Sequence, residues 1–134
     1  MEKKLIRMAL EARLNAYAPY SNYMVGASLL SESGEIYTGC NIENASYGAC
    51  NCAERTAVFK AVSQGEKHIR AICIVGGRGG EEPSSYAYPC GICRQVIDEF
   101  STSETKIIVA NNEDDYKVYS MEEMLPFAFS KDNL

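Results

Sequence analysis

The sequence predicts an α/β sandwich, in which helices pack against a single sheet. Segments with apolar residues at helical spacing alternate with short strand-like runs. One of these runs, residues 69–75, is almost continuously apolar, as expected of a buried central strand. The chain has 134 residues, which is the size of one domain. We therefore expect residues 1–134 to form a single domain.

The first part of the chain is expected to contain one helix and a β-hairpin. Apolar residues recur at helical spacing between residues 3 and 17, and Pro19 then ends the pattern. Strand-like runs over residues 24–31 and 35–39 are joined through Ser33-Gly34, which is typical of a hairpin. The predicted buried face of the helix consists of Leu5, Met8, Ala9, Ala12 and Ala16.

The rest of the chain alternates helices with strands. Cys52 is expected to lie at a helix N-terminus, and Cys90 opens a second helix directly after Pro89. Gly76-Gly77 is expected to end the central strand. The expected elements are helices over residues 53–62, 90–100 and 121–125, and strands over residues 69–75, 106–110 and 116–119.

Three of the six cysteines, together with one glutamate, have the spacing of a catalytic zinc site. Cys52-Ala53-Glu54 is followed downstream by Pro89-Cys90-Gly91-Ile92-Cys93. A helix N-terminus lowers the pKa of a cysteine and so favours the thiolate that binds metal. A structural zinc site is usually closed by four protein ligands, whereas a catalytic site keeps three and leaves the fourth position to water. The sequence therefore predicts that Cys52, Cys90 and Cys93 bind one Zn²⁺ and that Glu54 stays unbound.

The other cysteines are interpreted as structural. Cys50 has no glutamate two positions later, so we expect it to be a buried neighbour of the ligand Cys52. Cys40 and Cys73 are expected to be small core residues. Three thiolates around a zinc ion carry excess negative charge, and Arg55 is our candidate to compensate it.

Two other interpretations of the cysteines are a structural zinc site and a redox motif. A closed structural zinc clip would need a fourth ligand at the usual spacing, such as a second C-x-x-C, which the chain does not offer. A redox C-x-x-C would use Cys90 and Cys93 but would leave Cys52 and Glu54 without a role.

Further motifs extend over nearly the whole chain in a fixed order. They are Ala18-Pro19-Tyr20-Ser21, Val25-Gly26-Ala27, Asn41-Ile42-Glu43-Asn44-Ala45-Ser46-Tyr47-Gly48, Cys52-Ala53-Glu54-Arg55-Thr56-Ala57, Cys93-Arg94-Gln95-Val96, Leu125-Pro126 and Phe129. With these motifs the chain resembles the cytidine deaminases of the short, zinc-dependent, homotetrameric type.

The resemblance implies a three-layer α/β/α sandwich with a mixed five-stranded sheet. It also implies hydrolytic deamination of cytidine and deoxycytidine to uridine and deoxyuridine plus ammonia, in pyrimidine salvage. By this resemblance Glu54 takes a proton from zinc-bound water and delivers it to N3 of cytosine, while the hydroxide attacks C4. One Zn²⁺ per subunit is expected.

The resemblance also assigns the substrate contacts. Asn41 and Glu43 resemble the pair that holds the sugar 3′-hydroxyl, and Arg55 resembles the arginine that donates hydrogen bonds to the ligand sulfurs. The remaining expected contacts are the backbone N–H of Ala53 and the carbonyl before Pro89 to the pyrimidine, Tyr23 beside the base, and Phe129 stacked on a base in a neighbouring subunit. Tyr23 and Tyr88 depart from the phenylalanine and serine that this family often has at these positions.

Charge and composition limit the partners. The net charge is −5 and the basic residues are dispersed, whereas polyanion binding needs a clustered basic face, so no nucleic-acid partner is expected. The chain has no signal-peptide pattern and no apolar run approaching the ~20 residues that span a bilayer, so we expect a cytoplasmic protein without a membrane partner. The polar connection over residues 76–85 lacks the ending of a phosphate loop and is interpreted as a mobile rim.

Three rival functions follow from the same motifs. A deaminase of another aminated pyrimidine, such as blasticidin S, would keep the zinc ligands and Glu54 but would not need Glu43. A polynucleotide or tRNA deaminase would need a basic channel. A zinc module without enzyme activity would bind the metal but leave cytidine unchanged.

Overall fold

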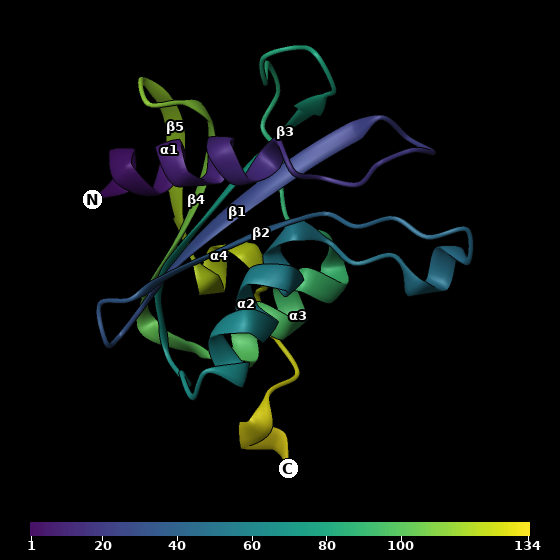
Figure 1. The fold of residues 1–134 in the computed structure, drawn as a ribbon. Coiled ribbons are helices and arrows are strands. Elements are labelled where there is room, and N and C mark those ends of the chain that lie inside the picture. Colours follow the sequence, from purple (N-terminus) through teal and green to yellow (C-terminus); the bar gives the residue numbers. More distant parts are fainter.

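Five strands form one sheet, and helices cover both of its faces (Figure 1). The structure is a computed structural model that describes residues 1–134. Its elements are α1 (Glu2–Arg13), β1 (Tyr23–Ser31), β2 (Ile36–Cys40), α2 (Ala53–Ser63), β3 (Ile69–Arg78), α3 (Gly91–Glu99), β4 (Ser101–Asn112), β5 (Asp115–Ser120) and α4 (Met121–Met124), with short 3-10 turns at Tyr47–Ala49 and Lys131–Asn133.

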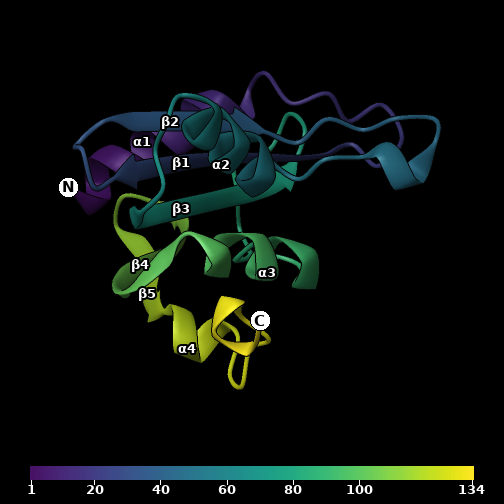
Figure 2. The same cartoon turned by 90° about the horizontal axis from the view of Figure 1, so that it is seen from below.

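The strand order is β2-β1-β3-β4-β5. The pair β3 and β4 is parallel and is joined through α3, whereas the other neighbouring strands are antiparallel. Helix α1 lies on one face of the sheet, and α2, α3 and α4 lie on the other (Figures 1 and 2). The predicted three-layer α/β/α sandwich with a mixed five-stranded sheet is therefore confirmed.

The alternating side chains of β3 divide the core into two layers. Ile72 and Ile74 pack with α2, α3 and α4, whereas Cys73 and Val75 pack with α1, and all four are at most 1% exposed. Burial on both faces explains why this strand has an almost unbroken apolar sequence. Cys73 is a core residue, as predicted.

Two glycines allow helices to approach the sheet closely. A Cβ atom at Gly26 on β1 would lie 2.0 Å from the backbone oxygen of Ala9 on α1. A Cβ atom at Gly39 on β2 would lie 2.6 Å from the backbone nitrogen of Ala57 on α2. Both distances are shorter than van der Waals contact, so any larger residue at either position would push a helix away from the sheet.

Helix α1 ends at Arg13, earlier than the predicted residue 17. The backbone nitrogen of Tyr17 donates to the oxygen of Asn41 at 3.0 Å, and the nitrogen of Glu43 donates to the oxygen of Tyr17 at 2.8 Å. These bonds hold Tyr17 in an extended bridge with Ile42. Long-range pairing therefore overrides the helical pattern in this segment.

The buried face of α1 also differs from the predicted one. Its buried residues are Leu5, Ile6, Ala9 and Arg13, whereas Met8, Ala12 and Ala16 are only half-buried. The Arg13 guanidinium is enclosed by three backbone oxygens: its Nε donates to Met24 at 2.9 Å, and its Nη2 donates to Arg78 at 2.7 Å and to Glu81 at 2.9 Å. Arg13 thus joins the start of β1 to the end of β3.

Loss of the Arg13 guanidinium should destabilise the fold. Arg13→Met would keep an apolar stem but remove three hydrogen bonds to backbone oxygens, so we expect the free energy of unfolding to fall by about 3 kcal/mol. Urea denaturation measures this difference. The matched control is Arg7→Met, because Arg7 is exposed and pairs only with Glu113, a surface contact worth less than about 1 kcal/mol. Equal effects of the two substitutions would contradict this role of Arg13.

Strands β3 and β4 extend furthest beyond their predicted ranges. Strand β3 continues through Gly76 and Gly77 to Arg78 because these residues pair with the first residues of β1. Strand β4 begins at Ser101, where the chain pairs with Ile69 at the start of β3.

None of the helices has the length and apolar character that a membrane-spanning helix needs.

Candidate active site

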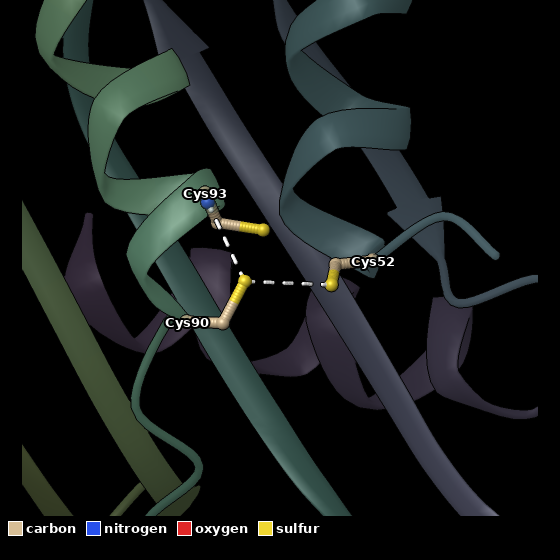
Figure 3. Close-up of side chains that lie close together, drawn as sticks. All are labelled: Cys52, Cys90 and Cys93. Carbon is tan, nitrogen blue, oxygen red and sulfur yellow. Dashed lines mark hydrogen bonds between the residues drawn. The ribbon is translucent and has the colours of Figure 1, made fainter. Parts of the chain in front are cut away.

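Cys52, Cys90 and Cys93 meet at the N-terminal ends of two neighbouring helices. Their sulfur atoms lie within 4.8 Å of one another, and the Sγ atoms of Cys52 and Cys90 are 3.9 Å apart (Figure 3). All six cysteines of the chain are free thiols. The three predicted ligands are therefore brought together, from segments 38 residues apart in the sequence.

The two helices place these sulfurs through local backbone geometry. Cys52 is the N-cap residue of α2 and Cys90 is the N-cap residue of α3. The Sγ of Cys90 accepts a hydrogen bond from the backbone nitrogen of Cys93 at 3.5 Å, so both sulfurs of the C-x-x-C segment face the same point (Figure 3). The free N–H groups and positive dipole ends of α2 and α3 converge there and stabilise negative charge on sulfur.

The electrostatics of the cluster favour thiolate. Hydrogen bonds from Cys93, Arg55 and Cys90 together lower the pKa of Cys52 to about 5, although burial acts in the opposite direction. The hydrogen bond between Cys93 and Cys52 raises the pKa of Cys93, and burial of Cys93 raises it as well. Within this pair, negative charge is favoured on Cys52 and the proton is favoured on Cys93. A metal ion bound to all three sulfurs would release that proton.

Arg55 supplies positive charge beside the sulfurs. Its Nη2 donates to the Sγ of Cys52 at 3.4 Å, and this hydrogen bond is the first cause of the raised pKa of Arg55. The Nε atom of Arg55 is buried and has no hydrogen-bond partner. The predicted contact of Arg55 with a ligand sulfur is present, which agrees with a role in charge compensation.

The three cysteines fit a zinc ion with one open coordination position. Tetrahedral zinc with bonds to sulfur of about 2.3 Å places neighbouring sulfurs roughly 3.8 Å apart. The distance of 3.9 Å between Cys52 and Cys90 agrees with this value. The cluster contains no fourth histidine, cysteine or carboxylate ligand. A site of this composition leaves room for water or substrate, as in catalytic zinc centres.

Glu54 lies in the first turn of α2, two residues after Cys52. Its side chain is only 4% exposed, and burial raises its pKa to about 7. Glu54 is not part of the sulfur cluster. A buried carboxyl group with a pKa near neutrality can both accept and donate a proton, which is the property that a general acid–base requires.

The sulfur cluster opens into a cavity of about 530 Å³. Seven predicted residues line it: Tyr23, Asn41, Glu43, Cys52, Ala53, Glu54 and Cys90. The other lining residues are Ser21, Val25, Ile74, Tyr86, Ala87 and Tyr88. The cavity therefore joins the expected metal ligands, the buried carboxyl group and the expected sugar-binding pair.

Asn41 lies in the cavity wall, and its side-chain amide is bonded to β1. Its Oδ1 accepts from the backbone nitrogen of Val25 at 2.8 Å, and its Nδ2 donates to the oxygen of Tyr23 at 2.8 Å. Asn41 thus fixes the start of β1 beside the cavity. An amide oxygen has two lone pairs, so Oδ1 can still accept one hydrogen bond from a ligand.

Glu43 is held by donors from the segment before β1. Its Oε1 accepts from the backbone nitrogens of Tyr20 at 3.0 Å and Ser21 at 3.2 Å, and its Oε2 accepts from the hydroxyl of Ser21. These hydrogen bonds lower the pKa of Glu43, and the bond from the Ser21 hydroxyl has the largest effect. The carboxylate is therefore charged and oriented at the mouth of the cavity.

The remaining predicted substrate contacts differ from one another in their exposure to solvent. Ala53 is fully buried and begins α2, and Tyr23 is 39% exposed with its ring beside Gly76. Phe129 is 62% exposed and does not line this cavity, and its backbone oxygen accepts from Gln95 of α3 at 2.8 Å. Its expected contact with a neighbouring subunit stays a prediction.

Two expectations about the other cysteines are wrong. Cys50 is half-exposed rather than buried, because it lies in the loop after the Tyr47–Ala49 turn, where its Sγ accepts from the nitrogen of Asn44 at 3.2 Å. Cys40 is also half-exposed, because it ends the edge strand β2. Neither belongs to the sulfur cluster.

Comparison with known proteins places the chain in a family. Residues 1–110 match the model of the cytidine and deoxycytidylate deaminase zinc-binding region. The chain belongs to the cytidine and deoxycytidylate deaminase family. The matched part includes Cys52, Glu54 and Cys90, which line the cavity, and the buried Cys93, which belongs to the same sulfur cluster.

Relatives of this deaminase chain match it over nearly their whole length. It is 48% identical over 132 residues to the cytidine deaminase of Sporosarcina psychrophila, which covers 98% of this chain and 93% of that protein. It is 45% identical over 130 residues to the cytidine deaminase of Halalkalibacterium halodurans, with 97% and 95% covered. The crystal structure of cytidine deaminase from Burkholderia pseudomallei superposes with a TM-score of 0.86 at 44% identity, covering 96% of this chain and 99% of the other.

Proposed function

We propose that this protein hydrolyses the amino group of cytidine and deoxycytidine, giving uridine or deoxyuridine and ammonia. The observation that carries the proposal is a cluster of three cysteine sulfurs, two of which line one cavity together with the buried carboxyl group of Glu54. The cluster has no fourth protein ligand, which suits a hydrolase better than a structural metal site. The full-length likeness to proteins named cytidine deaminase supports the same activity.

Glu54 is the proton carrier of the proposed reaction. Zinc, when bound to the three cysteines, lowers the pKa of water and so supplies the nucleophile. Glu54 is rigidly placed in the first turn of α2 and has little access to bulk water. Glu54 takes up a proton from the attacking water and transfers it to N3 of the base. Protonation of N3 makes C4 more electrophilic.

Backbone groups next to the metal ligands would orient the pyrimidine. The N–H of Ala53 is one of the amides that a helix leaves without an internal partner, and it faces the cavity end of α2. We propose that this N–H donates to the pyrimidine carbonyl and that the carbonyl of Tyr88 accepts from the amino group. The ring of Tyr23 would pack beside the base.

Asn41 and Glu43 would hold the sugar at the cavity mouth. Both line the cavity, and both are fixed by hydrogen bonds to the segment around Ser21 and Tyr23. A charged carboxylate accepts well from a free hydroxyl group but repels a phosphate. The pocket should therefore favour free nucleosides over 3′-phosphorylated or polymeric substrates.

Removal of the Glu43 carboxylate should weaken substrate binding. Glu43→Ala is expected to raise KM for cytidine by about tenfold with a much smaller change in kcat, because the lost contact acts on the sugar and not on the reacting atoms. Steady-state kinetics measure both constants. Glu11→Ala, an exposed change on α1, is the matched control. An unchanged KM in Glu43→Ala would rule out the sugar contact.

A substrate panel tests the proposed activity against its main rival. Cytidine, deoxycytidine and blasticidin S should be assayed side by side with zinc-loaded protein, and the products should be identified as the corresponding uracil nucleosides and released ammonia. We expect turnover of the first two. Turnover of blasticidin S alone would overturn the proposal and favour a deaminase of another aminated pyrimidine.

We further propose a cytoplasmic homotetramer with shared active sites, acting in pyrimidine salvage. Phe129 is exposed and lies outside the cavity of its own chain, as a residue that completes a neighbouring site would be. Light scattering combined with activity measurements tests this assembly. An active monomer would contradict the shared sites.

A further inference from the structure

Two tyrosines of the segment between β3 and α3 form one wall of the cavity, and both are tied to β5. We call Tyr86 and Tyr88 the aromatic wall and residues 79–89 the rim segment. We propose that Asp115, at the start of β5, is a positioning residue that holds the aromatic wall for substrate binding. Asp115 does not line the cavity itself.

A chain of hydrogen bonds connects the aromatic wall to the body of the sheet. The hydroxyl of Tyr86 donates to Oδ1 of Asp115, and Oδ2 of Asp115 accepts from Nδ2 of Asn111 at 2.9 Å. Asn111 belongs to β4 and is only 7% exposed. Both carboxylate oxygens of Asp115 are thus used, one toward the buried strand and one toward the cavity wall.

Further contacts fix the two rings from their other sides. The Nζ of Lys117 lies 5.1 Å from the centre of the Tyr86 ring, within the range of a cation–π contact. The edge-to-face contact between Tyr86 and Tyr88 has a centroid distance of 6.4 Å, and a second one joins Tyr88 to Tyr119 at 5.9 Å. The hydroxyls of Tyr88 and Tyr119 are 3.0 Å apart.

The rim segment has few other attachments. Its first part is held by Arg13, which donates to the oxygen of Glu81. Between residues 82 and 88 the structure contains no backbone hydrogen bond to the rest of the chain, and the only side-chain hydrogen bonds are those of the two tyrosine hydroxyls. Pro83 and Ala87 pack against Gly77 and Gly76 of β3, so the backbone of this part is supported by β3. The side-chain hydrogen bonds that orient the two tyrosine rings come from β5. The sequence-based interpretation of a mobile rim does not take these anchors into account.

The aromatic wall should affect binding more than chemistry. Glu54 and Cys52 are placed by α2, and the carbonyl of Pro89, next to Cys90, is fixed separately by Nε of Arg94 at 2.7 Å. Loss of the Asp115 contact thus leaves the metal ligands and the proton carrier in place. If the aromatic wall is not held in place beforehand, part of the binding free energy is used to order it when substrate binds. Substrate affinity then falls, although the reacting groups are unchanged.

The experiment rests on the proposed deaminase function and uses zinc-loaded protein with cytidine. We expect Asp115→Ala to raise KM by about fivefold, with kcat within about twofold and with unchanged zinc content. Tyr86→Phe should give the same result because it removes the other half of the bond. The double variant should be no worse than Asp115→Ala alone, because both substitutions remove the same bond between Tyr86 and Asp115. Asp115→Asn should restore most of the affinity, because its amide oxygen can accept from Tyr86.

Asp114→Ala is the matched control, because Asp114 lies in the same turn and makes only a surface contact with Lys3. A KM in Asp115→Ala close to that of the unchanged protein, or effects of Asp115→Ala and Tyr86→Phe that multiply in the double variant, would overturn the inference while the deaminase function stands. A parallel loss of kcat and zinc would also overturn it. Unchanged protein that does not deaminate cytidine would instead refute the proposed function, and this inference with it.

Discussion

Replacing Glu54 by glutamine is expected to lower kcat on the order of 10⁴-fold, at the upper end of what acid–base catalysis contributes. Glutamine has nearly the same size, so the packing of this 4% exposed side chain is kept. An amide cannot take up the proton that the reaction must move from water to the base. Zinc content should stay at one per chain, because Glu54 is not among the three sulfur ligands.

Two measurements check this expectation together. The fall in cytidine absorbance gives kcat, and atomic absorption gives the zinc content of the same sample. Glu99→Gln is a suitable control because Glu99 ends α3 and is exposed. A near-normal rate in Glu54→Gln would show that another group moves the proton. Loss of zinc in this variant would show that Glu54 supports the metal instead.

Replacing Cys90 by alanine is expected to abolish both zinc binding and activity. Two cysteines cannot hold zinc as three can, because a tetrahedral zinc site needs at least three protein ligands. The melting temperature of purified Cys90→Ala should no longer rise when zinc is added, because ligand binding stabilises only a fold that can bind it.

Cys50→Ala is the matched control for this substitution. Cys50 lies only two residues before Cys52, yet its sulfur contacts Asn44 and lies outside the cluster. This variant should keep one zinc per chain and its activity. The ligand assignment would be wrong if Cys50→Ala lost its zinc, or if Cys90→Ala retained it.

The proximity of the candidate site residues within each helix N-terminus could be predicted from the sequence because it is set by local geometry. A residue at a helix N-cap has a fixed relation to the first turn, so Cys52 and Glu54 necessarily lie near each other, and so do Cys90 and Cys93. The meeting of the two helix ends depends on the sheet and was supplied by the resemblance. The apolar pattern of β3 was likewise sufficient to predict a central strand.

The parts that the sequence did not predict depend on contacts between distant segments. Arg13 is one of the basic residues dispersed along the sequence, yet it is buried because β1, the end of β3 and the rim segment each bring one carbonyl oxygen to it. The role of Ser21 as a donor to Glu43 depends on the folding of two loops. No sequence motif points to a role for Tyr86, because its partner Asp115 lies 29 residues further along the chain and only the fold brings the two together.

The central claim is that a zinc ion held by three cysteines is required for hydrolysis of cytidine. The most direct test follows the absorbance of cytidine with protein that has been stripped by a chelator and then restored with one equivalent of Zn²⁺. We predict that the stripped protein is inactive and that the restored protein converts cytidine to uridine. Equal activity with and without the metal, or a zinc-saturated protein that leaves cytidine unchanged, would contradict the claim.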